Sequence, residues 1–259
     1  MSLRTNQVGF SQRIRLEWLG QAANLVLGGN DAPAIHAELQ NILLDKVSIG
    51  SNADRGNRGK IITIISRVWV NVPEKTADLR VDALELLKRL PGPQRLAVHW
   101  GMVAAVYPFW AAVAGCVGRL LRLQGSVAAI HVQRRIREQY GERETVSRAT
   151  RRVLRSFVDW GVLKETNTKG VYDQGLHLPV DDPALAAWLI EASLHARSDG
   201  TGILKDLIEN PSLFPFSLNP PTAGSLLALS LRLEVARLGL DEDLVVLREK
   251  DRPKEGSGR

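Results

Sequence analysis

Cysteine and histidine are scarce in this chain of 259 residues, which has one cysteine, Cys116, and five histidines. A single cysteine excludes an intramolecular disulfide and a cysteine-based metal cluster, and favours a reducing compartment, the cytoplasm. Cys116 lies in an apolar run typical of a small core residue. No histidine has a second ligand at a spacing typical of metal sites, and the acidic runs at 181–182 and 241–243 are typical of helix caps or surface charge. We therefore expect no metal and no cofactor.

The motifs of common enzyme classes are also missing. There is no GxSxG, no HExxH and no dinucleotide-binding fingerprint. Gly59-Lys60 does not belong to a phosphate-binding P-loop, because Asp54 stands where the first glycine is needed and Ile61 stands where Ser or Thr is needed. These absences predict a protein that is not an enzyme.

Charged side chains are absent from residues 96–118, and that length could span a bilayer. Pro108 and His99 lie inside the run, and Gly, Ala and Trp are mixed through it. We interpret the run as two buried helices separated by Pro108, with a membrane anchor as the alternative. The first 18 residues lack the apolar core of a signal peptide, so a cytoplasmic protein with no membrane contact is expected.

Basic charge is concentrated in the middle of the chain. Residues 119–172 contain 12 Lys+Arg and 5 Asp+Glu, a net charge of +7, whereas residues 173–259 contain 9 and 14, a net charge of −5. A localised basic segment is what a polyanion partner attracts. A solvated basic face would produce the same count.

Helical periodicity dominates and predicts a mainly α fold of helical bundle domains with a winged helix-turn-helix. We expect four parts: an N-terminal helical domain with a basic loop (1–93), apolar helices plus the winged helix-turn-helix (94–180), a C-terminal helical region (181–248) and a disordered tail (249–259). The apolar segment 210–216 is expected to pack on the core, and 244–247 to form an edge strand. The predicted helices cover 11–27, about 32–44, 60–70, 76–90, two segments within 94–123, 127–140, 145–160, one from 183, 203–209 and 222–238. For 60–70 a strand is the alternative, because the segment is rich in β-branched residues.

The winged helix-turn-helix is predicted over residues 125–178. A helix at 127–140, with Val127 and Ile130 available for a core, is followed by a turn at 141–143 and a second helix at 145–160. Apolar residues of the second helix recur at the spacing of one buried stripe. After Gly161, residues 162–164 and 171–172 can pair as strands around the tip at 167–170, which forms the wing.

The other face of the second helix predicts contact with double-stranded DNA. A helix reads the major groove when one face is anchored and the free face carries groups that meet phosphates and base edges. No acidic residue occurs between positions 146 and 157. A protein-interaction module and a solvated face are the alternatives. The expected contacts from the helix and wing are Ser147, Arg148, Arg151, Arg152, Arg155, Lys164 and Lys169.

A second basic stretch surrounds the polar loop at 48–59. Arg55, Arg58 and Lys60 are its candidate DNA contacts, with Arg67 nearby. The alternative is a plain surface loop.

Three segments in this order resemble the BrxA family of BREX phage-defence systems. They are NILLDK (41–46) followed by IITIISRVWV (61–70), the apolar run leading to SFVDWGVL (156–163), and NPSLFPF (210–216). The resemblance implies a small, largely helical, non-catalytic DNA-binding protein that works beside a methyltransferase, an ATPase and other defence-system proteins. A winged-helix transcriptional regulator is the alternative function, as is an assembly module whose acidic C-terminal region holds a basic partner.

Overall fold

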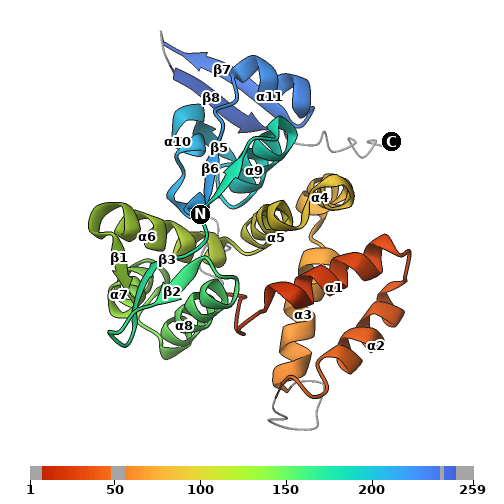
Figure 1. Ribbon diagram of the computed structural model, residues 1–259. Helices are drawn as coiled ribbons and strands as arrows, with labels where there is room; N and C mark the ends of the chain where they lie inside the picture. Colours follow the sequence, from red (N-terminus) through yellow and green to blue (C-terminus); the bar gives the residue numbers. More distant parts are fainter. Residues whose placement is uncertain (1–7, 48–55, 240–241, 249–259) are drawn as a thin grey trace, which may run out of the picture.

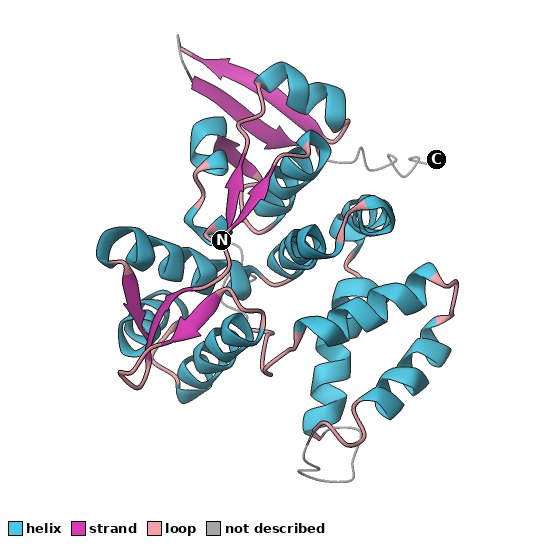
Figure 2. Ribbon diagram, viewed as in Figure 1, coloured by secondary structure: helices cyan, strands magenta, loops and turns pink. Residues whose placement is uncertain are grey.

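The computed structural model describes residues 8–47, 56–239 and 242–248, and within them the chain is mainly helical with small sheets (Figures 1 and 2). Three lobes surround a pair of apolar helices. The N-terminal lobe contains helices only, whereas strands occur in the other two lobes (Figure 2). The predicted tail at 249–259 and the core of the basic loop, including Arg55, lie outside the described residues.

The N-terminal lobe is formed by α1 (Leu16–Leu27), α2 (Ala32–Ile42) and α3 (Asn57–Trp69). Asp31 caps α2 by accepting a hydrogen bond from the Ala34 N–H, as an acidic residue before a helix with proline in its first turn should. The helix predicted at 60–70 is confirmed by α3. The helix predicted at 11–27 begins only at Leu16, because the preceding residues run extended along another lobe.

The central helices are α4 (Ala77–Arg89), preceded by a 3-10 turn (Glu74–Thr76), α5 (Gly92–Val106) and α6 (Pro108–Gln124). The prediction that Pro108 separates two buried helices is confirmed, since almost every residue of α5 after Arg95 is buried. Among the described residues no single helix is long and apolar enough to cross a membrane; α5 and α6 meet that condition only as a pair, which bends by 118°.

A module of helices and strands follows α6. It contains β1 (Ser126–Ala128), α7 (Ala129–Tyr140), α8 (Glu144–Asp159), β2 (Leu163–Glu165) and β3 (Val171–Gln174). The strands form an antiparallel sheet in the order β1-β3-β2. A hairpin around the tip at 167–170 is confirmed, but its register differs from the predicted one, since residues 163–165 pair with 172–174. Val171 pairs instead with Ala128 of β1, a strand that was not predicted. Val127 belongs to this strand rather than to the helix, and Ile130, expected in the core, is 63% exposed.

The C-terminal lobe contains a two-stranded parallel sheet, β4-β6, and a three-stranded sheet in the order β5-β8-β7. Its elements are β4 (Leu178–Val180), α9 (Pro183–His195), β5 (Thr201–Ile203), α10 (Leu204–Ile208), a 3-10 turn (Pro211–Leu213), β6 (Phe216–Leu218), α11 (Ala223–Leu229), β7 (Leu233–Leu238) and β8 (Glu242–Leu247).

Two predictions for this lobe are wrong. The helix expected at 222–238 ends after Leu229, and the chain continues as β7. Pairing with β8 places Val235 opposite the fully buried Val245, and this burial favours the strand. The strand at 244–247 exists, but it lies in the middle of its sheet rather than at the edge.

The hydrophobic core is continuous from Phe10 to Val245, and an aromatic cluster joins the lobes within it. Trp100 of α5 contacts Trp110 of α6, Phe157 of α8 and Phe214, with ring centroids 5.0–5.5 Å apart. The segment at 210–216 packs on the core as predicted. It approaches α6 so closely that a Cβ on Gly118 would lie 2.0 Å from the Pro211 carbonyl oxygen, so this position requires glycine.

Candidate nucleic-acid interface

Helix α8 buries a broad face and exposes a narrow one. Its buried residues are Val146, Ser147, Ala149, Thr150, Val153, Leu154, Ser156 and Phe157. The exposed positions 144, 148, 151 and 155 follow one another at intervals of four, three and four residues, and therefore lie on one line along the helix. Arg148, Arg151 and Arg155 on this line, here called the arginine stripe, have side chains that are 58%, 55% and 46% exposed.

The end of α8 is determined locally by Gly161, which has a φ of 73° that favours glycine. The Gly161 N–H donates to the Val158 carbonyl and the Val162 N–H donates to the Phe157 carbonyl, both at 3.0 Å. This pair of bonds is the Schellman termination. It turns the chain directly into β2, so the hairpin β2-β3 follows the stripe without a long linker.

The hairpin places Lys164 and Lys169 on the surface, as the sequence predicted. Lys164 lies opposite Asp173 in the strand register, and Glu165 follows it on β2. At the tip, the Thr166 hydroxyl donates to the Val171 carbonyl and accepts from the Thr168 N–H, which closes the turn. The two lysines are therefore available, but two carboxylates accompany them on the same hairpin.

An extended N-terminal segment, residues 10–15, holds the flank of α8. The Ile14 N–H donates to the buried Ser156 hydroxyl oxygen at 2.9 Å, and the Trp160 indole N–H donates to the Ile14 carbonyl at 2.9 Å. Arg152 donates to the Ser11 carbonyl oxygen. Because these contacts join residues more than 140 positions apart, sequence periodicity could not reveal them.

Two of the predicted contact residues are therefore not on the free face. Ser147 is only 6% exposed, since it shares a buried line with Thr150 and Leu154, and the prediction of an exposed Ser147 is wrong. Arg152 is half-buried and bound to the N-terminal segment. Burial lowers the pKa of its guanidinium, and the positive charges of Arg148 and Arg151 lower it further.

Each arginine of the stripe has a carboxylate partner. Arg151 Nη2 lies 3.0 Å from Glu144 Oε1, and Arg148 Nη2 lies 3.8 Å from the same oxygen. Arg155 pairs with Glu165 of β2. The stripe is therefore flanked by acidic groups just outside the segment 146–157. Ion pairs as exposed as these contribute little, about 0–1 kcal/mol each, so the arginines can exchange partners readily.

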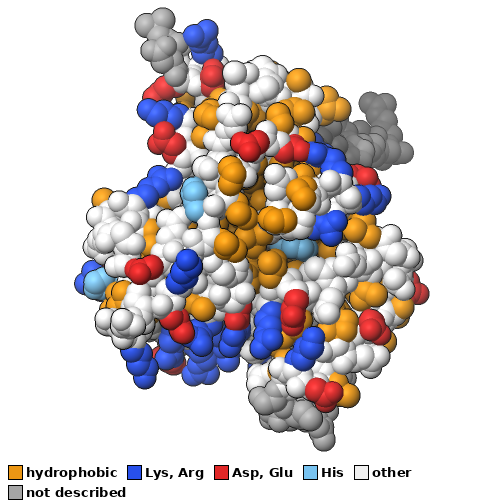
Figure 3. Space-filling model, in the orientation of Figure 1, with side chains coloured by type: hydrophobic (Ala, Val, Ile, Leu, Met, Phe, Trp, Pro, Cys, Tyr) orange, Lys and Arg blue, Asp and Glu red, His pale blue; other side chains and the backbone are white. Residues whose placement is uncertain are grey.

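Two further basic residues lie on the N-terminal segment and were not predicted. Arg13 pairs with Asp159 near the end of α8, and the Arg15 guanidinium lies over the Trp18 ring, 5.5 Å from its centroid. Their signal was the alternation in QRIR, where buried Gln12 and Ile14 alternate with the two exposed arginines. Figure 3 shows Lys and Arg side chains along the lower edge of the lobe that contains α8, with more at the junction to the N-terminal helices.

The second predicted contact region lies in the N-terminal lobe, near the start of α3 (Figure 1). Lys60 is exposed there. Arg58 is half-buried and donates to the Leu44 carbonyl at 3.3 Å, so it ties α3 to the end of α2. These residues and the arginine stripe belong to different lobes.

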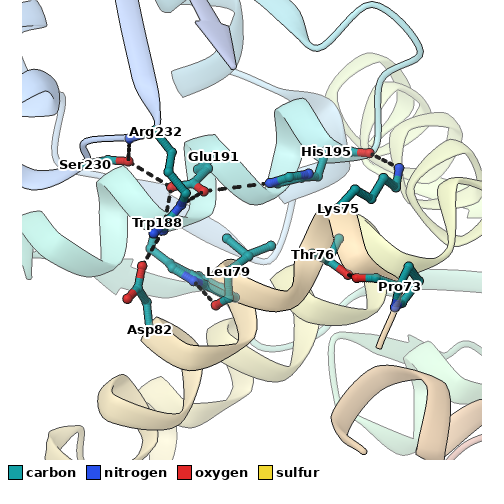
Figure 4. Close-up of polar contacts among 10 residues, drawn as sticks. All are labelled: Pro73, Lys75, Thr76, Leu79, Asp82, Trp188, Glu191, His195, Ser230 and Arg232. Atoms are coloured by element: carbon teal, nitrogen blue, oxygen red, sulfur yellow. Dashed lines mark hydrogen bonds and ion pairs between the residues drawn. The ribbon is translucent and has the colours of Figure 1, made fainter. Parts of the chain in front are cut away.

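A separate polar cluster joins α9, α4 and the segment at 230–232 between α11 and β7 (Figure 4). Glu191, which is 1% exposed, accepts hydrogen bonds from Arg232 Nε at 2.7 Å and from the Ser230 hydroxyl at 3.0 Å. Burial alone would raise the pKa of Glu191, but hydrogen bonds from His195, Arg232 and Ser230 and the Arg232 charge outweigh it and lower the pKa. Arg232 also pairs with Asp82 of α4. The cluster borders a cavity of about 220 Å³, and its contacts hold the C-terminal hairpin on the central helices.

Within the described part of the chain, no group of three or more His, Cys, Asp or Glu side chains is arranged to hold a metal ion. Comparison of the chain with models of known protein families, with curated proteins and with solved structures returns no match. The function has to be argued from the geometry of the site itself.

Proposed function

We propose that this protein is a non-catalytic binder of double-stranded DNA, and that the segment from α6 to β3 is a winged helix-turn-helix with α8 as its recognition helix. The observation that carries the proposal is the arginine stripe, three exposed guanidinium groups on the free face of a helix whose other face is buried. The order helix, strand, helix, helix, hairpin supports it, as do the lysines of the hairpin. The proposal includes a role in bacterial phage defence, as the resemblance to the BrxA family implies.

The stripe suits phosphates and base edges for two reasons. Guanidinium groups bind phosphate oxygens and guanine edges in a bidentate manner. The helix that carries them is anchored by its buried face and, at its C-terminal end, by the aromatic cluster and the N-terminal segment, so little ordering is required on binding. Arg13 and Arg15 extend the basic surface past the end of α8.

The test is a double substitution, Arg148→Ala with Arg151→Ala, assayed by fluorescence anisotropy with a labelled duplex over a series of salt concentrations. Each lost arginine contact should cost about 1–3 kcal/mol, and each lost phosphate contact should reduce the salt slope by about 1. Arg152 is left unchanged, because it supports the N-terminal segment.

Arg197→Ala with Arg248→Ala is the matched control. Both residues are exposed, and each forms an ion pair in the C-terminal lobe. The control should bind DNA like the wild type. If the wild type fails to bind any duplex at low salt, or the stripe variant binds as tightly as the control, the proposal is wrong.

A protein-assembly module is the second candidate, and a specific observation favours it. Exposed large apolar side chains are concentrated around α11 and β7, where Leu227, Leu229, Leu231 and Leu238 are 42–83% exposed. Such clusters are typical of protein interaction sites. This function does not require the arginine stripe. The arginine variants therefore distinguish the two candidate functions.

A further inference from the structure

The carboxylate of Glu144 occupies a position that phosphate binding alone does not explain. Glu144 is the first residue of α8 and lies on the same line as the arginine stripe. Its side chain is 63% exposed, and its Oε1 atom is the one shared by Arg148 and Arg151. If the stripe served only to neutralise phosphates, this carboxylate would weaken binding, because it repels the same groups that the arginines attract.

The N-terminal turn of a recognition helix is the part that faces the base edges. A carboxylate there can only accept hydrogen bonds, so it needs an amino group. In the major groove these are the cytosine N4 and adenine N6 groups. Adenine N6 lies beside the acceptor N7, which repels a carboxylate, whereas cytosine has no acceptor on its own edge next to N4. Cytosine is therefore the base that suits this position.

We propose that Glu144 is a specificity-determining residue that accepts a hydrogen bond from the amino group of a cytosine in the bound duplex. The inference rests on the proposed DNA binding. Arg148 and Arg151 share the Oε1 atom of Glu144, and all three side chains lie on the exposed line of α8. A duplex without cytosine opposite Glu144 leaves the carboxylate without a donor and close to acceptors, and such a duplex binds less tightly.

Glu165 provides the matched control. It also pairs with an arginine of the stripe, Arg155, and its side chain is 58% exposed. It lies on β2 rather than on the first turn of α8, so its removal changes the charge of the site without removing the base contact.

The experiment sequences the fraction of a random duplex pool that is bound by the wild type, Glu144→Ala, Glu144→Gln and Glu165→Ala. The wild type should prefer cytosine at one position, with other bases bound roughly 5- to 150-fold more weakly, as for a good direct base contact. Glu144→Ala should lose this preference and bind the average duplex more tightly. Glu165→Ala should bind more tightly with its preference intact, and circular dichroism checks that each variant is folded.

The outcomes separate this inference from the proposed function. A wild type that binds DNA without preferring cytosine, or a Glu144→Ala profile identical to that of the wild type, would overturn the role of Glu144 and leave DNA binding standing. A Glu144→Gln variant that keeps the cytosine preference at full strength would also count against a carboxylate contact. A wild type that binds no duplex overturns the proposed function and this inference with it.

Discussion

Replacing His99 with leucine should make the folded protein less sensitive to mild acid. His99 lies in α5 within the core, its ring edge-on to Trp69 at a centroid distance of 5.2 Å. Its Nδ1 atom is buried and has no hydrogen-bond partner among the described residues. Burial lowers the pKa of His99 from 6.5 to about 3, and the positive charge of Arg95 adds to this effect.

The sign and size of the effect follow from proton linkage. Between pH 6.5 and about 3 the unfolded chain binds a proton at His99 that the folded chain does not, so the free energy of unfolding falls as the pH falls through this window. With one pKa unit equivalent to 1.36 kcal/mol, the loss between pH 7 and pH 5 is about 2 kcal/mol. Leucine has no such proton to bind, and it also removes the unpaired Nδ1 atom.

Urea unfolding followed by tryptophan fluorescence at pH 7 and pH 5 measures this effect. The stability loss between the two pH values should be about 2 kcal/mol smaller in His99→Leu than in the wild type, and differences in packing cancel because each protein is compared with itself. The exposed His36 supplies the control, since His36→Gln should lose as much stability as the wild type. Equal losses in His99→Leu and the wild type would refute a neutral, desolvated His99.

Two further substitutions test the contacts that hold the lobes together. Glu191→Gln removes the buried charge that Arg232 pairs with, and should lower the free energy of unfolding in urea by about 3 kcal/mol. The control Glu85→Gln, at an exposed pair, should lower it by less than about 1 kcal/mol. Similar losses in both variants would contradict the structural role of the cluster. Ser156→Ala leaves the buried Ile14 N–H without its acceptor and should cost about 1–3 kcal/mol in the same assay; an unchanged free energy of unfolding would show that the N-terminal segment does not anchor α8.

The helices with a clear amphipathic pattern could be predicted from the sequence. The helix expected at 145–160 is α8 within one residue at each end, and α4 and α9 follow their predicted segments closely. For α8 and α4, one apolar stripe and a glycine or proline after it were sufficient. Helix α9 is buried on all sides at residues 185–194, and its signal was the Asp182 cap followed by Pro183. The hairpin was predictable from its polar, glycine-containing tip at 167–170.

Elements that depend on pairing with another segment could not be predicted in this way. The segment LRLEVARL at 231–238 fits a helix as well as a strand, and the choice depends on β8, which follows in sequence and places Val245 opposite Val235. Residues 11–15 continue the helical pattern of α1, yet they are extended because Ser156 and Trp160 bind their backbone. In both cases pairing with another segment, the next strand in one and a distant helix in the other, overrides local preference.

The candidate site was predictable in its location but not in its charge balance. Counting residues identified the arginines of α8, since composition and helical spacing suffice for that. Glu144 and Glu165 belong to the site through geometry, one from the first turn of the helix and the other from the next strand. The count also included Arg152, whose hydrogen bond goes to Ser11 rather than to solvent.

The carboxylates of Glu144 and Glu165 reduce what the arginine stripe should contribute to DNA binding. Salt dependence reflects the number of phosphates that a protein neutralises. The three arginines already pair with two carboxylates. Each contact between an arginine and a phosphate would therefore replace part of an existing ion pair, so the net positive charge offered to the duplex is smaller than three. On the proposed function, the number of arginines is therefore an upper bound on the phosphates that α8 would neutralise. On the proposed function, such a face would distinguish duplexes by whether Glu144 finds a donor rather than by the strength of its positive charge.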